Sequence, residues 1–79
     1  MKKLLINIEF KILNLKFTIC VSNELTLKEI IDFIITNKEL KEIYNYEFLV
    51  FERYLKEKLD LHTSINELNI YNNIEIVVF

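Results

Sequence analysis

The side chains that could carry out chemistry are few and scattered along the chain. Cys20 is the single cysteine and His62 the single histidine. A cysteine nucleophile needs an activating base, and no histidine or aspartate motif stands near Cys20 in the sequence. A zinc site needs three or four ligands, which one cysteine and one histidine do not supply. We therefore expect an inert, reduced thiol at Cys20 and no catalytic, metal or cofactor-binding residues.

The acidic residues that come closest to forming a catalytic pair are Glu52, Glu57 and Asp60. They alternate with lysines through one segment of the chain. This interleaving is typical of solvated charge on a hairpin rather than of a general acid and base. Because no nucleophile, acid/base pair or metal cluster is present, the sequence predicts that the protein is not an enzyme.

Composition and charge narrow the remaining function classes. The chain has 79 residues, of which 52% are hydrophobic, so we expect one small domain over residues 1–79 with a core of its own. The net charge is −2 with lysine and glutamate interspersed, which argues against nucleic-acid binding. No stretch approaches the about 18 apolar residues of a membrane span. Together with the single cysteine, this predicts a cytoplasmic protein.

The first elements expected are two strands joined by a tight turn. Residues 4–12 alternate between apolar and mostly polar positions, and residues 15–22 resume the alternation. Asn14 stands between them, where a turn needs positive φ, which asparagine tolerates. The inward side chains of this hairpin are Leu4, Ile6, Ile8, Phe10, Ile12, Phe17, Ile19 and Val21.

A helix is predicted after this hairpin. Thr26 and Glu29 have the spacing of a capping box, in which each side chain accepts a hydrogen bond from the backbone N–H of the other residue. Apolar residues then recur at helical spacing, and the helix is expected to end near Asn37 or Lys38. The apolar stripe consists of Leu27, Ile30, Ile31, Ile34 and Ile35, with Phe33 widening it.

The second half of the chain is predicted to return to strands. Residues 39–47 form a connector with one helical turn, and residues 48–51 a buried strand. A short strand at 59–61, a capped turn from Ser64 to Ile70 and a last strand at 74–79 follow. A mixed sheet of four to five strands, with the first and last parallel and one helix on one face, accounts for this order. The predicted fold class is therefore α+β, of the β-grasp type.

The pattern resembles the ubiquitin-like superfamily over nearly the whole chain. Thr26 with the apolar stripe is similar to the capped central helix of ubiquitin, and residues 49–51 to its third strand. Residues 64–70 are similar to its Thr-Leu-Ser-Asp-Tyr-Asn-Ile segment. The family's Gly-Ile-Pro-Pro connector is replaced by residues 40–45, and the chain stops at Phe79 without a diglycine tail. Conjugation to other proteins needs that tail, so the resemblance implies a non-conjugated protein that acts by non-covalent binding.

Three narrower interpretations remain open. In length, termination and pattern the chain resembles the YukD/EsaB-like accessory proteins of bacterial type VII secretion. A free-standing adaptor fits as well, as does a structural subunit fixed in a larger assembly.

The resemblance implies that a protein partner docks on the sheet face opposite the helix. Arg53 and Tyr54 would form polar rim contacts, and self-association through this patch is the alternative. A second hypothesis is that the edge strand with Thr18, Cys20 and Ser22 accepts a partner strand. The residues expected to point away from the helix are Phe48, Val50, Val77 and Phe79, and Leu13 is expected nearby in the first hairpin loop. Those expected inward are Leu49, Phe51, Ile70, Ile76 and Val78.

Overall fold

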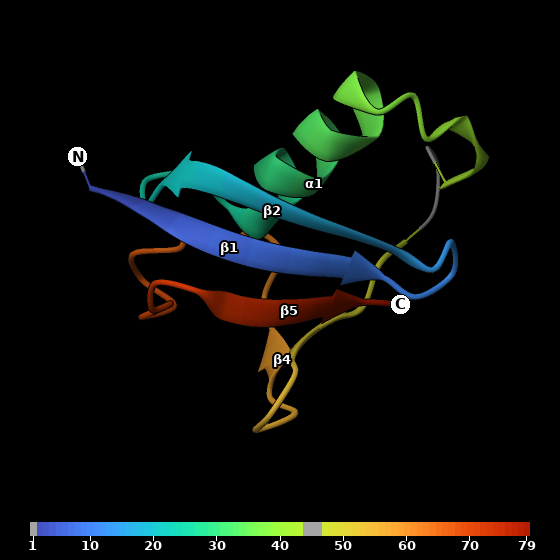
Figure 1. Ribbon diagram of the computed structural model, residues 1–79. Coiled ribbons are helices and arrows are strands. Elements are labelled where there is room, and N and C mark those ends of the chain that lie inside the picture. Colours follow the sequence, from blue (N-terminus) through green and yellow to red (C-terminus); the bar gives the residue numbers. More distant parts are fainter. Residues whose placement is uncertain (1, 44–46) are drawn as a thin grey trace.

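The computed structural model describes residues 2–43 and 47–79 and contains one mixed sheet, one α-helix and a short 3-10 helix (Figure 1). The predicted helical turn in the connector corresponds to the 3-10 helix, and residues 44–46 of that connector lie outside the described residues. In chain order the elements are β1 (Lys3–Phe10), β2 (Leu15–Ser22), α1 (Leu27–Asn37), η1 (Lys41–Ile43), β3 (Val50–Glu52), β4 (Lys58–Leu59) and β5 (Ile74–Val78).

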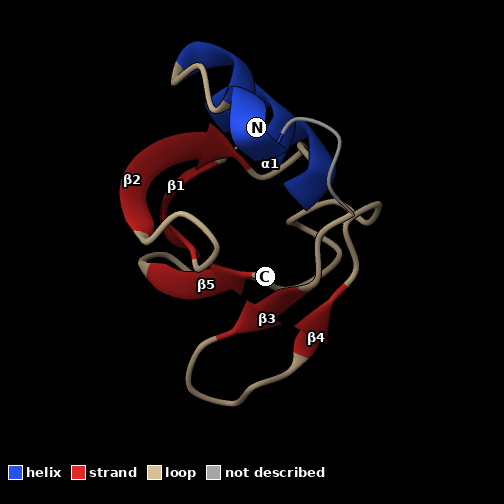
Figure 2. Cartoon of the chain, turned by 90° about the vertical axis from the view of Figure 1, so that its right-hand side faces the viewer, coloured by secondary structure: helices blue, strands red, loops and turns tan. Residues whose placement is uncertain are grey.

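The five strands lie in the order β2-β1-β5-β3-β4. β1 and β5 are parallel, and the other neighbours are antiparallel. In the end-on view of Figure 2 the sheet curves and α1 closes its concave side. The core, built around Ile6, Ile8 and Phe10, includes the buried residues of α1. This arrangement confirms the predicted α+β, β-grasp fold.

The first hairpin forms as the alternation predicts, but β1 is shorter than expected. It ends at Phe10, and the N–H of Leu13 donates to the Phe10 carbonyl at 3.2 Å to start the turn. Asn14 has φ of 52°, which confirms its predicted left-handed conformation. Ile12 was expected inward but is 53% exposed, because the backbone has already left the strand ladder at that residue.

The capping box and the apolar stripe of α1 are both confirmed. The Glu29 N–H donates to Thr26 Oγ1 at 3.2 Å, and the Thr26 N–H donates to Glu29 Oε1 at 3.1 Å. The five residues predicted to form the stripe are buried. Phe33 is 62% exposed, so the prediction that it widens the stripe is wrong. At 3.6 residues per turn, Phe33 lies about 60° around the helix from Ile30 and about 100° from Ile34. It therefore stands at the border of the stripe, beside β2, where its ring is open to solvent.

The inward and outward residues of the third strand are the reverse of those predicted. Phe48 and Val50 are buried in the core, while Leu49 is 49% exposed. Cross-strand partners share a face, and Val50 pairs with the inward Val78 whereas Phe51 pairs with the outward Val77. The apolar run at 48–51 contains no polar residue to mark its outer side, so its pattern could not assign the faces. Ile76 and Val78 are buried as predicted.

Candidate functional site

The sheet face opposite α1 carries a group of apolar side chains from β3 and β5 that we call the outer patch: Leu49, Phe51, Val77 and Phe79. Leu49 and Phe79 exchange backbone hydrogen bonds of 3.3 and 2.8 Å, which extends the β3–β5 ladder beyond the two strands. The rings of Phe51 and Phe79 meet edge to face, with centroids 5.7 Å apart. Leu49 and Phe79 are 49% and 55% exposed, so the outer patch presents apolar surface to solvent.

A shallow depression lies beside the outer patch. Val77, although it faces outward, is only 6% exposed. The residues that line the depression mix the apolar patch with cationic side chains and are Lys11, Phe51, Glu52, Arg53, Lys56, Val77 and Phe79. A hollow with an apolar floor and positively charged sides is suited to receiving an apolar side chain flanked by acidic groups.

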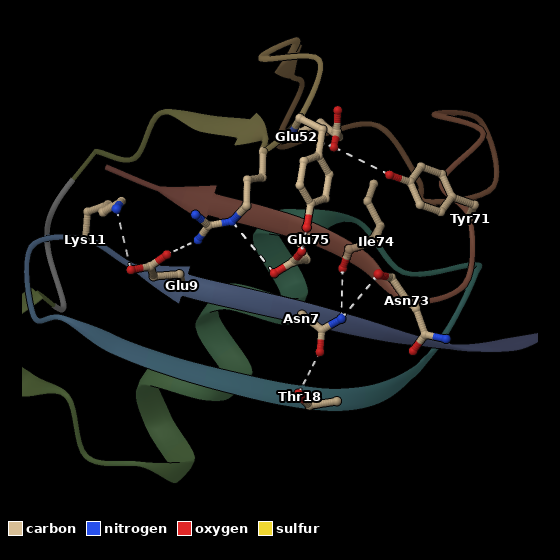
Figure 3. Close-up of polar contacts among 11 residues, drawn as sticks. Asn7, Glu9, Lys11, Thr18, Glu52, Tyr71, Asn73, Ile74 and Glu75 are labelled. Atoms are coloured by element: carbon tan, nitrogen blue, oxygen red, sulfur yellow. Dashed lines mark hydrogen bonds and ion pairs between the residues drawn. The ribbon is translucent and has the colours of Figure 1, made fainter.

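Next to the depression lies an ionic cluster, which consists of Glu9, Lys11, Arg53, Tyr54 and Glu75. The Arg53 guanidinium donates to the carboxylate of Glu9, and its Nε lies 3.8 Å from Glu75 Oε1. Lys11 Nζ lies 3.6 Å from the second oxygen of Glu9. The Tyr54 hydroxyl donates to Glu75. Figure 3 shows Glu9 and Lys11 on β1 and the following turn, with Glu75 on the neighbouring strand.

Two groups of this cluster, Glu9 and Tyr54, have shifted pKa values. Burial raises the pKa of Glu9, but the hydrogen bond from Arg53 and the positive charges of Lys11 and Arg53 outweigh it, so the pKa falls below the ordinary value of 4.5. The hydrogen bond and negative charge of Glu75 raise the pKa of Tyr54 above 10.0. At neutral pH Glu9 is therefore ionised and Tyr54 neutral. The hydrogen bonds and ion pairs among these side chains make the cluster a rigid polar rim.

A second carboxylate, that of Glu52, shapes the loop beside the outer patch. It accepts hydrogen bonds from the backbone N–H groups of Tyr54 and Leu55, at 2.9 and 2.7 Å, and from the Tyr71 hydroxyl at 3.4 Å. The two backbone hydrogen bonds lower the pKa of Glu52. The interpretation of Glu52 as solvated charge is wrong, since the residue is 4% exposed. Its role in the structure is to fix the loop that carries Arg53 and Tyr54.

Of the residues predicted to bind a partner, four lie on or beside the outer face. Val77 and Phe79 belong to the outer patch, and Arg53 and Tyr54 to the ionic cluster. Phe48 and Val50 do not, because both are core residues, and Phe48 packs edge to face on Phe10 with centroids 6.3 Å apart. Leu13 is partly buried and packs against the core.

The sequence did not identify Leu49 and Phe51 as members of the outer patch, or Glu9 and Glu75 as members of the ionic cluster. The only available signal was that Glu9 and Glu75 occupy outward positions on the first and last strands. The parallel pairing of those strands, in which Glu9 neighbours Val77, places both acids beside Arg53.

Other kinds of site were sought in the part of the chain that the structure describes. Among those residues, no group of three or more histidine, cysteine, aspartate or glutamate side chains is placed to hold a metal ion. None of the described helices is long and apolar enough to cross a membrane.

Comparisons with known proteins identify the fold. No protein-family model matches the chain, and no curated protein sequence matches it significantly. Several solved structures do, among them an archaeal ubiquitin from Caldiarchaeum subterraneum with a TM-score of 0.74 and 10% identity, covering 98% of this chain and 91% of that one. A ubiquitin-like domain from Arabidopsis thaliana has a TM-score of 0.64 and 20% identity, covering 100% and 78%.

A third similar structure comes from work described as molecular mimicry of SUMO that promotes DNA repair. Its TM-score is 0.78 at 14% identity, covering 100% of this chain and 92% of the other. The chain therefore has the ubiquitin-like fold. At these identities, the likeness establishes the fold alone.

Proposed function

We propose that this ubiquitin-like domain is a protein-interaction module that binds its partner non-covalently through the outer patch. One observation carries the proposal: Leu49 and Phe79 are about half exposed side by side on a rigid sheet, above a depression that Phe51 and Val77 line. Contiguous apolar side chains on a folded surface mark interaction sites, and aromatic residues are enriched among the anchors of such sites.

The charges around the depression support a partner of particular chemistry. Lys11, Arg53 and Lys56 all line it, and the one acidic residue in the lining, Glu52, is buried and occupied with backbone N–H groups. Arg53 is held in place by Glu9, so it can present its remaining donors without losing further side-chain freedom. The partner we propose offers an aliphatic or aromatic anchor flanked by acidic side chains.

The proposal is tested by partner capture with variants of single surface residues. Leu49→Asp and Phe79→Asp should each abolish capture of proteins that the wild type retains, because a charge at the centre of an apolar contact is not compensated. Leu55→Asp is the matched control, since Leu55 is a 71% exposed leucine in the β3–β4 loop outside the lining of the depression. Capture that Leu49→Asp and Phe79→Asp leave unchanged, while both variants remain folded, would refute the outer patch.

A captured partner can then be located on the surface by NMR. Titration into the labelled domain should shift amide signals of Leu49, Phe51 and Phe79 more than those of α1. Lys56→Glu should weaken the complex and reduce its salt dependence, because the proposed partner is acidic. Shifts confined to α1 or β2 would place the partner elsewhere.

The identity of the partner decides which of several narrower roles the protein has. As part of the proposal, the protein is a cytoplasmic adaptor without enzymatic activity, and the type VII secretion accessory role and the fixed-subunit role would use this same surface. A permanent apolar interface should survive high salt, whereas a transient, charge-assisted one should not. Co-purification at high and low salt therefore distinguishes a fixed subunit from an adaptor.

A further inference from the structure

The free edge of β2 forms a second apolar surface, distinct from the outer patch. β2 is eight residues long and lies at the end of the sheet, with β1 as its neighbour among the described strands. α1 lies beside β2 (Figure 1). Residues of both elements line a groove whose walls are mostly apolar. The residues that line this edge groove are Ile19, Cys20, Val21, Ser22, Leu25, Glu29, Ile30 and Phe33.

The hydrogen-bonding groups along this edge follow from the β1–β2 register. The Asn23 N–H donates to the Lys2 carbonyl at 2.8 Å, so Asn23 and every second residue before it turn their backbone groups toward β1. In an antiparallel ladder the residues between them turn theirs the other way. The N–H and C=O groups of Lys16, Thr18 and Cys20 and the N–H of Ser22 therefore point away from β1 along the open edge. The Ser22 carbonyl already accepts a hydrogen bond from the Leu25 N–H at 3.2 Å.

Edges of this kind are normally protected by proline, bulges, or several charged side chains. β2 contains no proline, pairs with β1 through eight consecutive residues without a bulge, and carries one charged residue, Lys16. Beside it Phe33 is 62% exposed. A long, regular and largely uncharged edge flanked by an exposed aromatic ring is suited to pairing with another strand.

We propose that a second copy of this chain covers the edge, with β2 pairing antiparallel to β2 of the second copy about a twofold axis at Ile19. This register sets Thr18 opposite the second copy's Cys20 and Lys16 opposite its Ser22, so the free backbone groups of Thr18 and Cys20 pair with those of the second copy. The contact is isologous and closes on itself, which gives a dimer with one continuous sheet.

The distribution of charge favours this occupant and this register. The edge has a basic end beyond the groove, where Lys38 Nζ stands 5.8 Å from the Phe17 ring, two residues before Ile19. It has an acidic end where Glu29 lines the groove together with Val21 and Ser22, which follow Ile19. Antiparallel pairing about Ile19 brings the basic end of each copy toward the acidic end of the other. An axis at Phe17 would bring the two Lys38 side chains together, and an axis at Val21 the two Glu29 side chains.

The exposed ring of Phe33 also finds a place in this dimer. Phe33 and Ile19 line the same groove, so an axis at Ile19 brings the two Phe33 side chains to either side of the seam. Each ring can then cover the partly buried Ile19 of both copies. The ring that α1 leaves exposed beside β2 thus becomes part of the contact.

Sedimentation equilibrium over a wide concentration range tests the dimer. The wild type should show a reversible monomer–dimer equilibrium. Phe33→Asp should raise the dissociation constant at least about tenfold, because it sets two carboxylates near the axis. Leu55→Asp, at an equally exposed position remote from the edge, should leave the constant unchanged. A wild type that stays monomeric at millimolar concentration, or a dimer that Phe33→Asp does not weaken, would overturn the proposal.

Disulfide trapping tests the register. Residues at the axis form a non-hydrogen-bonded pair with Cα atoms about 4.5 Å apart, within the range that a disulfide spans. Ile19→Cys in a Cys20→Ser background should therefore cross-link rapidly under mild oxidation. The native Cys20 should not, because its counterpart lies diagonally, about 8 Å away. Rapid cross-linking through Cys20 instead, or a monomer that binds a foreign extended peptide at this edge, would contradict the second copy in this register.

Discussion

Glu9 and Arg53 lie 44 residues apart in the sequence, yet the Arg53 guanidinium donates directly to the Glu9 carboxylate on the outer face of the sheet. The Glu9 side chain is 8% exposed and that of Arg53 30%. The contact joins the first strand to the loop after the third, across the final strand that lies between them. The two halves of the chain are therefore joined by this ion pair as well as by their shared hydrophobic core.

The Glu9–Arg53 pair predicts an asymmetry between single and double substitutions. Arg53→Met should destabilise the domain more than the double variant Glu9→Gln with Arg53→Met, because the single change leaves a shielded carboxylate without its main partner. Denaturant unfolding of the wild type, both single variants and the double variant measures the coupling. Strictly additive effects would mean that the two side chains do not interact in solution.

The lowered pKa values of two carboxylates predict that the domain loses stability in acid. The pKa values of Glu9 and Glu52 lie below 4.5 in the folded protein. As the pH falls below that value, the unfolded chain takes up protons before the folded one does, so the free energy of unfolding decreases. The stabilisation is fully present above about pH 5 and is lost as the pH falls through the folded-state pKa values. Urea unfolding from pH 7 to pH 3 measures how the free energy of unfolding changes with pH.

The acid dependence should shrink when one of the carboxylates is removed. Glu52→Gln should unfold more easily at neutral pH but lose less stability between pH 5 and pH 3 than the wild type. Glu57→Gln is the matched control, because Glu57 is exposed. Equal slopes for wild type and Glu52→Gln would show that Glu52 does not contribute to the acid response.

The reversed faces of the third strand predict opposite outcomes for two aspartate substitutions. Val50 is 1% exposed, so Val50→Asp buries an unpaired charge and should cost more than about 4 kcal/mol, close to the whole stability of many small domains. Phe79→Asp removes one aromatic contact at the surface and should cost about 1 kcal/mol. Circular dichroism and thermal unfolding compare the folding and stability of the two variants. A folded Val50→Asp variant would mean that Val50 faces outward, as the sequence had predicted.

The capping box at the start of α1 predicts a measurable loss of stability when the cap is removed. Thr26→Ala removes the hydroxyl that accepts from the Glu29 N–H and should cost about 1 kcal/mol. In a domain of this size that corresponds to a decrease of about 4–8 °C in Tm. Thr26→Ser keeps the hydroxyl and should stay near the wild type. If both substitutions lower the Tm equally, the methyl group rather than the cap is responsible.

Local sequence patterns were sufficient to predict the features that depend on residues close together in the chain. The alternation of β1 and β2, the left-handed Asn14, and the capping box and apolar stripe of α1 were all predicted because each depends on residues within a few positions. Phe33 lies at the border of the helical stripe, and there the period alone did not decide whether the ring is buried or exposed.

The sequence by itself determined the fold class, because the order of alternating and helical segments admits few ways to bury the apolar residues. It did not determine which residues of 48–51 face the core, since an uninterrupted apolar run is compatible with either face. That choice depended on the pairing of Val50 with Val78, a contact across 28 residues of chain. The pairing of β3 with β5 also brings Arg53 to Glu75, and the parallel pairing of β5 with β1 brings Glu9 to the same place. Tertiary structure therefore decided which residues join Val77 and Phe79 on the outer face.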